Sequence, residues 1–150
     1  MIAVVVVRAG QLPAGGAEAI AECAGRVMLV GSELDTAIAD LAGIATEVTT
    51  VELDDFLPGA WAQALAPLLA EEPILLLPGS PDGRDLAPRL ASLLHRPLFA
   101  GATAVSPQRV EMARNGGREL HSCSPGTEFV ATLQPGARGV EVTPVGRRRR

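Results

Sequence analysis

The stretch Pro73–Leu94, PILLLPGSPDGRDLAPRLASLL, decides the fold that this sequence predicts. It starts with a short apolar run, continues through a loop rich in glycine and proline, and ends in an amphipathic helical pattern with two arginines. A buried strand, a loop and a helix in this order form the repeating unit of a parallel α/β sheet, and such sheets usually bind ligands at these loops. The loop is therefore the first candidate site.

The sequence before this stretch follows the same alternation of strand and helix. Three continuous apolar runs predict strands buried on both faces of a parallel sheet, namely Ile2–Val7, Val27–Val30 and Ile74–Leu77. Thr46–Leu53 predicts a further strand, and helical patterns occupy Ala17–Ala24, Ser32–Ala45 and Pro58–Glu72. We expect Ser32 to cap its helix. Strands that alternate with helices predict right-handed crossovers and three layers.

The sequence after about residue 97 predicts antiparallel strands. Asn115-Gly116-Gly117 indicates a hairpin turn between Gln108–Arg114 and Arg118–Ser122, and further strands are expected at Gly101–Ser106 and Glu128–Leu133. The predicted fold class is α/β, a three-layer Rossmann-like sandwich with a mostly parallel sheet and an antiparallel C-terminal hairpin. We expect one domain over residues 1–136, followed by a short tail at 137–150 that is disordered at its Arg-rich end.

Composition and charge narrow the possible functions. The chain has 150 residues, of which 47% are hydrophobic, and this suffices for one domain with a sizeable core. All 13 basic residues are arginine, a habit of GC-rich bacterial genomes. Removing the four positive charges of Arg147–Arg150 from the net charge of −4 leaves −8. So acidic a body repels phosphate backbones, which argues against nucleic-acid binding.

The cysteines and the hydropathy pattern predict a soluble cytoplasmic protein. Cys23 and Cys123 lie far apart, and the sequence has neither a C-x-x-C motif nor a secretory pattern. No apolar run approaches the roughly 18 residues that a membrane span requires. We interpret the basic end, Arg147–Arg150, as a solubilising tail, the alternative being a membrane or nucleic-acid contact.

The loop after Ile74–Leu77 offers the main candidate site, with Ser80, Gly83, Arg84 and Arg89 as residues that would contact an anion or a partner. It would feed a helix N-terminus, whose free N–H groups attract anions. The loop matches neither of the phosphate-binding motifs G-x-G-x-x-G and G-x-x-x-x-G-K-[ST], however. Asp82 also places a negative charge in it. The alternative is a tight loop with ordinary caps, in which the arginines pair with Asp82 and Asp85.

This helix contains Pro88, so we expect it to start near Asp85, with Asp82 or Asp85 as its cap. Proline is harmless in the first turn of a helix, where its missing N–H would have no partner. Pro67 lies in the middle of the preceding helical pattern. It is expected to kink or restart that helix, because a proline in a helix interior removes a backbone hydrogen bond.

We expect the histidines, the paired aspartates, Cys23 and Trp61 to have structural roles. No catalytic residue and no metal site is therefore expected. His95 and His121 lack metal-like spacing to other ligands, and His121 has no evident activating acid. Asp54-Asp55 is interpreted as a solvated loop, since adjacent acids on an extended chain point to different sides. Cys23 is expected to fill the core, and Trp61 to anchor its helix.

The segment Leu75–Leu94 resembles the N-terminal domain of the electron-transfer flavoprotein α subunit. The matching residues are Pro78, Gly83-Arg84-Asp85 and Pro88-Arg89-Leu90-Ala91. Further matches follow in the family's order, namely the Val-rich first strand, Val30-Gly31, Leu65-Ala66-Pro67-Leu68, the hairpin, and Phe129–Leu133 before Pro135-Gly136. The similarity covers about residues 1–136. The family's C-terminal domain, which carries most FAD contacts, has no counterpart in this sequence.

The resemblance implies a non-catalytic scaffold subunit that pairs with an electron-transfer flavoprotein β-like subunit. It implies flavin-mediated electron transfer from a flavin-dependent dehydrogenase, with FAD bound only in the complex and AMP possible in the partner. The docking surface is expected to be mostly apolar, on one side of the sheet or on its antiparallel end. The alternative is a stand-alone nucleotide-binding α/β module of the universal-stress or adenine-nucleotide hydrolase type.

Overall fold

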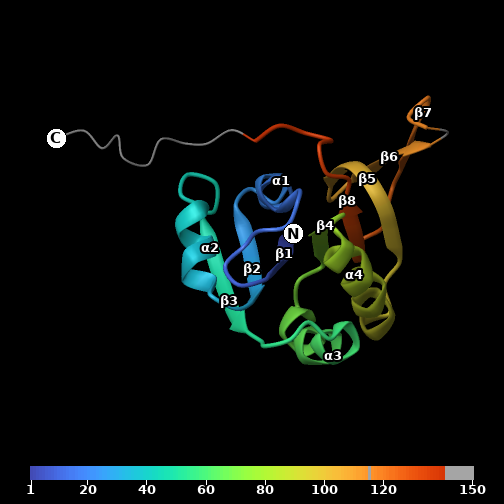
Figure 1. Cartoon of the computed structure of the whole chain (residues 1–150). Helices are drawn as coiled ribbons and strands as arrows, with labels where there is room; N and C mark the ends of the chain where they lie inside the picture. Colours follow the sequence, from blue (N-terminus) through green and yellow to red (C-terminus); the bar gives the residue numbers. More distant parts are fainter. Residues whose placement is uncertain (115, 141–150) are drawn as a thin grey trace.

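The computed structural model describes residues 1–114 and 116–140, which form one α/β sandwich (Figure 1). Its elements are β1 (Ile2–Val7), α1 (Gly16–Glu22), β2 (Arg26–Gly31), α2 (Leu34–Asp40), β3 (Glu47–Glu52), α3 (Pro58–Leu69), β4 (Ile74–Pro78), α4 (Pro81–Leu94), β5 (Leu98–Ser106), β6 (Arg109–Arg114), β7 (Glu119–Cys123) and β8 (Phe129–Leu133). The sheet order is β3-β2-β1-β4-β8-β5-β6-β7. The predicted fold class is therefore confirmed.

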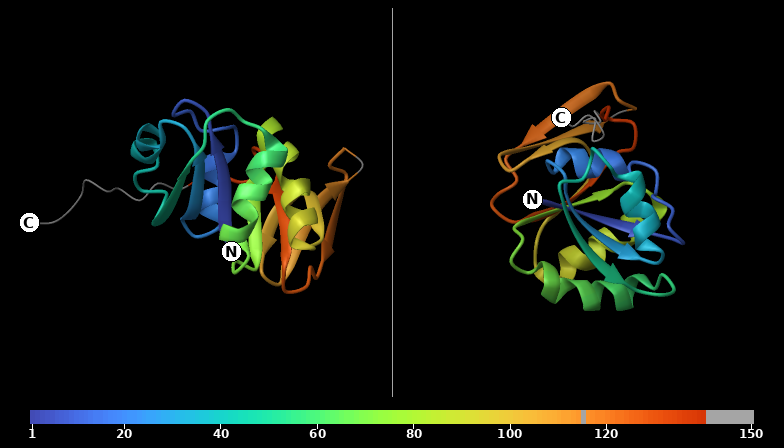
Figure 2. Two further views of the ribbon diagram at one scale, coloured as in Figure 1. Left: turned by 90° about the horizontal axis from the view of Figure 1, so that it is seen from below. Right: turned by 90° about the vertical axis from the view of Figure 1, so that its left-hand side faces the viewer.

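Helices cover both faces of the sheet (Figure 2). The sheet thereby divides the hydrophobic core into two halves, one on each face. On one face α1 and α2 bury Ile20 and Leu34 against alternate residues of β1 and β2. On the other face α3 and α4 bury Trp61 and Leu86 against the remaining residues of these strands. Every residue of β1, β4 and β8 is buried, as expected for strands sandwiched between two helical layers.

The last strand, β8, lies inside the sheet and departs from the predicted antiparallel order. It pairs in parallel with both β4 and β5, and only β5, β6 and β7 pair antiparallel. Phe129–Leu133 is a continuous apolar run apart from Thr132, which is the pattern of a strand buried on both faces. The predicted hairpin of β6 and β7 is confirmed, and it projects away from the helices (Figure 1).

Two helices begin where the sequence did not predict. Helix α4 starts at Pro81 after Ser80, whose hydroxyl accepts a hydrogen bond from the Gly83 N–H at 3.2 Å. Pro88 consequently lies inside α4, where its exposed ring faces solvent while the neighbouring leucines bury the opposite side. Ser32 does not cap α2, because its hydroxyl accepts from the Ala9 N–H at 3.0 Å.

Helix α3 continues through Pro67 without interruption. The predicted break is wrong because Pro67 lies near the end of the helix, on its exposed side, while Leu65 and Leu69 are fully buried. Their burial offsets the one backbone hydrogen bond that the proline removes.

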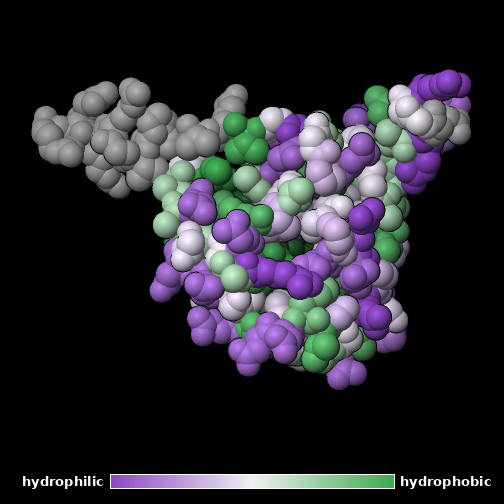
Figure 3. All heavy atoms as spheres, viewed as in Figure 1, coloured by the Kyte–Doolittle hydropathy of each residue, from purple (hydrophilic) through white to green (hydrophobic). Residues whose placement is uncertain are grey.

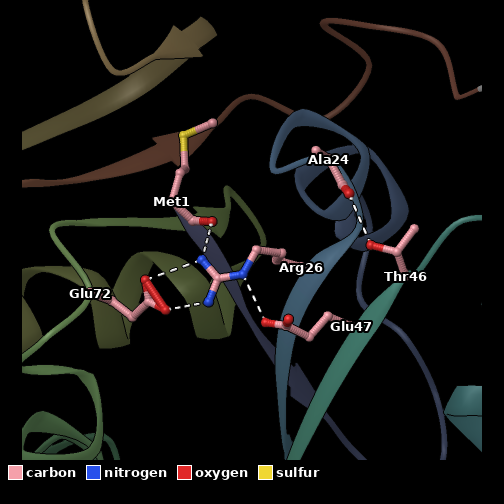
Figure 4. Close-up of polar contacts among 6 residues, drawn as sticks. All are labelled: Met1, Ala24, Arg26, Thr46, Glu47 and Glu72. Atoms are coloured by element: carbon pink, nitrogen blue, oxygen red, sulfur yellow. Dashed lines mark hydrogen bonds and ion pairs between the residues drawn. The ribbon is translucent and has the colours of Figure 1, made fainter.

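Arginine side chains connect the amino ends of the strands (Figure 4). Arg26 donates to the carboxylates of Glu47 and Glu72 and to the Met1 carbonyl. The hydrogen bond that Arg26 donates to Glu72 raises the pKa of Arg26 and, reciprocally, lowers that of Glu72. These contacts join the starts of β1, β2 and β3 to Glu72, which lies just before β4.

The segment after β8 is attached to α1 by carboxylate hydrogen bonds. Glu18 accepts from the Gly136 and Arg138 N–H groups at 2.8 and 3.1 Å. Glu22 accepts from the Arg138 guanidinium at 2.7 Å and from the Val105 N–H at 2.7 Å. Arg138, which follows the expected domain boundary at residue 136, thus contacts the domain. The Arg-rich end, 147–150, lies outside the described residues.

Candidate functional site

The carboxyl edge of the sheet contains the position where open α/β sheets usually bind ligands. Going outward from β1, the chain passes first to β2 and β3 on one side and then returns to β4 on the other. The loops after β1 and β4 therefore diverge to opposite faces and leave a crevice between them, at the topological switch point. Arg8 follows β1, and Ser80 to Asp82 follow β4.

Arg8 and Asp82 form a bidentate ion pair across this crevice. The Arg8 Nε and Nη2 atoms donate to the two carboxylate oxygens of Asp82 at 2.6 and 2.8 Å. This hydrogen bond raises the pKa of the Arg8 guanidinium, which also lies over the Phe56 ring at 5.1 Å from its centroid. The charge that would attract an anionic ligand is thereby already neutralised within the chain.

The N-terminus of α4 retains little capacity to bind an anion. Pro81 has no N–H, and the Gly83 and Arg84 N–H groups donate to the Ser80 hydroxyl and carbonyl at 3.2 and 2.9 Å. Asp82 adds a negative charge in the first turn. A side chain at Gly83 would also collide with the Pro78 carbonyl, so this glycine serves close packing. Ser80 and Gly83 thus form an ordinary helix start.

A small cavity of about 180 Å³ lies beside the ion pair, between the loops that follow β1, β2 and β3. Phe56 and Trp61 meet edge to face there, with ring centroids 4.9 Å apart, and the indole N–H donates to the Asp55 carbonyl. Trp61 is buried and anchors α3, as predicted, while Asp54 and Asp55 are exposed in their loop, which confirms that interpretation.

Arg84 and Arg89, the other two predicted site residues, are exposed on α4 and line different grooves. Arg84 faces a groove between α4 and β5, and Arg89 faces one between α4 and α3. Within residues 1–114 and 116–140 neither arginine forms an ion pair. The expected local pairing is wrong for Asp82, because that carboxylate contacts Arg8 from the neighbouring strand.

The remaining candidates are separate from one another. His95 is the exposed left-handed cap of α4, and His121 contacts the Glu119 carboxylate at 2.9 Å, an acid that the sequence interpretation missed. Both partners of that contact are exposed. Cys23 is buried in the core, where burial raises its thiol pKa to about 12. No group of three potential metal ligands occurs in the described part of the chain.

Sequence reasoning did not find Arg8, although a signal exists. A charged residue that directly follows a continuous apolar strand must lie at the carboxyl edge of the sheet, where it can reach the next loop across the switch point. The partner, Asp82, was considered as a helix cap and as a local partner for Arg84 and Arg89, but not as a partner for Arg8. Their pairing depends on β1 and β4 being neighbours, which is a property of the topology.

The comparison with known families agrees with this topology. The family described as "Electron transfer flavoprotein domain" matches residues 4–141. The chain belongs to the electron transfer flavoprotein family. A search of curated proteins found no match to it. Among the described helices of this electron transfer flavoprotein domain, none is long and apolar enough to cross a membrane.

Proteins of the electron transfer flavoprotein family generally bind flavin, but the described residues do not fit a complete flavin dinucleotide site. The crevice at the switch point is bridged by Arg8 and Asp82, and the cavity beside it is only about 180 Å³. Every buried side-chain nitrogen or oxygen among the described residues already has a hydrogen-bond partner. No buried side-chain polar group among the described residues of this edge is therefore left unpaired to recognise a pyrophosphate.

Proposed function

We propose that this chain is an α-like scaffold subunit that pairs with a β-like subunit in flavin-mediated electron transfer. Its electrons come from flavin-dependent dehydrogenases, and the chain itself performs no catalysis. FAD is bound by the complex, and any AMP by the partner subunit. The protein works in the cytoplasm as part of a heterodimer.

The family match over residues 4–141 carries this proposal, because it spans both the parallel half and the antiparallel hairpin. The α-like assignment is supported by the resemblance at Gly83-Arg84-Asp85 and Pro88-Arg89, which α4 carries. The scaffold role is supported by the carboxyl edge, where Arg8 and Asp82 satisfy each other instead of awaiting a ligand. Flavin chemistry belongs to the cofactor, and a scaffold contributes its position and surroundings.

The test compares the chain expressed alone with the chain co-expressed with an electron transfer flavoprotein β-type subunit from the same organism. We expect the isolated chain to be colourless. The co-expressed pair is expected to co-purify as a heterodimer and to show the visible absorbance of bound flavin at one flavin per pair. A dehydrogenase substrate should then reduce that flavin only when its dehydrogenase is present.

Three results would contradict the proposal. The isolated chain could bind stoichiometric FAD, or it could fail to associate with the β-type subunit at micromolar concentrations. A rise in the melting temperature of the isolated chain with AMP or ATP would instead favour the nucleotide-binding module, since ligands that bind only the native state stabilise it.

A further inference from the structure

An apolar groove of about 330 Å³ lies between α4 and the first half of β5. Its walls are Pro88 of α4, Leu98 and Ala100 of β5, and Pro135 after β8. Leu98 is 36% exposed and Ala100 is also exposed, although residues in this position of an α/β layer are usually covered by a helix. The helical layer of this face therefore ends at α4 and leaves apolar surface uncovered.

The groove is open because β5 is irregular. The strand pairing shifts between Phe99 and Ala102, and Gly101 has a φ of 75°. The Gly101 N–H donates to the Thr132 hydroxyl at 2.9 Å, so a side chain of β8 occupies the place of a regular strand hydrogen bond. A side chain at Gly101 would meet nothing within 4 Å, so there is free space beside this residue.

The charge at the rim of the groove points to an anionic occupant. Arg84 is exposed there and has no ion-pair partner in the described part of the chain. None of the residues that line the groove is acidic, and the acid next along α4, Asp85, does not line it. In a molecule of net charge −4, an apolar groove whose rim holds a guanidinium that is unpaired among the described residues favours an occupant with one carboxylate beside an apolar group.

We propose that this groove docks the partner subunit, and that the occupant is a segment of the β-like subunit with a large apolar side chain next to a carboxylate. The apolar side chain fills the space between Pro88 and Leu98, and the carboxylate pairs with Arg84. A buried apolar anchor with a charged neighbour is a common arrangement at the centre of protein interfaces. This inference rests on the proposed function and adds the docking surface to it.

The test measures the dissociation constant between the chain and the co-expressed β-type subunit for two groove variants. Ala100→Trp fills the groove, and Arg84→Glu reverses its charge. The matched controls are Ala64→Trp, at an exposed position of α3, and Arg89→Glu, on the same helix but facing the other groove. Thermal unfolding of each isolated variant establishes that it is folded.

We expect each groove variant to weaken the complex at least tenfold and each control to change it less than threefold. A complex that forms equally well with both groove variants overturns the docking surface and leaves the proposed function standing. Failure of the wild-type chain to form any complex contradicts the proposed function and this inference together. If the groove variants instead dissociate a homodimer of the wild-type chain in sedimentation experiments, the occupant is a second copy and the inference is wrong.

Discussion

The two edges of the sheet both place an arginine between strands, but they use it differently. At the amino edge, Arg26 contacts two carboxylates and a carbonyl (Figure 4). The nearby Arg96 is buried against the end of α3. At the carboxyl edge, Arg8 contacts one carboxylate, and its side chain is 60% exposed. The amino edge is therefore a structural clamp, whereas the carboxyl edge is joined by one solvent-accessible ion pair.

The difference shows where this sheet has room for function. In α/β sheets the amino edge is usually structural and the carboxyl edge binds ligands. Here Arg8 and Asp82 neutralise each other at the switch point, and the apolar groove lies farther along the sheet, between α4 and β5. In the view of Figure 3 the projecting hairpin of β6 and β7 carries hydrophilic and apolar residues side by side, and Leu120 of β7 is 67% exposed.

The largest expected effect at the amino edge is that of Arg96→Met. The Arg96 guanidinium donates to the carbonyls of Ala70, Glu72 and Pro73 at 3.0, 2.6 and 3.3 Å, and its side chain is only 3% exposed. Methionine keeps the apolar stem but leaves these carbonyls without their donor. We expect a loss of about 3 kcal/mol in the free energy of unfolding, measured by urea denaturation.

The control for this experiment is Arg114→Met, since Arg114 is exposed at the hairpin and is expected to change stability by less than about 0.5 kcal/mol. If Arg96→Met costs no more than this control, the carbonyls find other partners and Arg96 is not part of the clamp.

Replacing the central arginine of each edge tests the comparison directly. Arg26→Ala removes contacts to Glu47, Glu72 and Met1 from a side chain that is 35% exposed, and we expect it to cost about 2 kcal/mol. Arg8→Ala removes one exposed pair and is expected to cost under about 1 kcal/mol. Chemical denaturation of both variants gives the two values. Equal costs would mean that both edges are equally structural.

Much of the fold could be predicted from the sequence because local patterns set it. The continuous apolar runs of β1, β2 and β4 admit only buried strands, and the glycine turn specifies the hairpin of β6 and β7. The position of β8 could not be predicted, because the choice between edge and centre depends on which strands are left unpaired. The start of α4 was missed because burial of its leucines outweighs the local cost of Pro88.

The candidate site was less predictable than the fold. Arg84 and Arg89 were identified by their type and loop position, but their separation into two grooves depends on how α4 packs. The Arg8 to Asp82 pair joins residues 74 positions apart, so only the topology brings them together. The groove beside β5 arises from a strand irregularity at Gly101, for which the sequence offers no more than a glycine.

The smallest expected effect is the pH dependence of stability that Glu72 contributes at the amino edge. The Arg26 hydrogen bond holds the pKa of Glu72 below its ordinary value of 4.5. A carboxyl whose folded pKa is lowered stabilises the protein above its unfolded pKa and loses this contribution as the pH falls through the folded pKa. Glu72 therefore stabilises the fold at neutral pH, and this contribution declines only as the pH falls below 4.5 toward the lowered pKa of the folded protein.

Glu72→Gln removes this titration while keeping the size of the side chain. We expect the variant to be less stable than the wild type at neutral pH by under about 1 kcal/mol, and the difference to shrink as the pH falls below the ordinary carboxyl pKa of 4.5. The matched control is Glu71→Gln, since Glu71 is exposed and its carboxylate forms no hydrogen bond within residues 1–114 and 116–140. Urea denaturation across this range gives both curves. A difference in unfolding free energy that stays constant across this range would mean that protonation of Glu72 does not change stability. The contact with Arg26 would then depend on geometry rather than on charge.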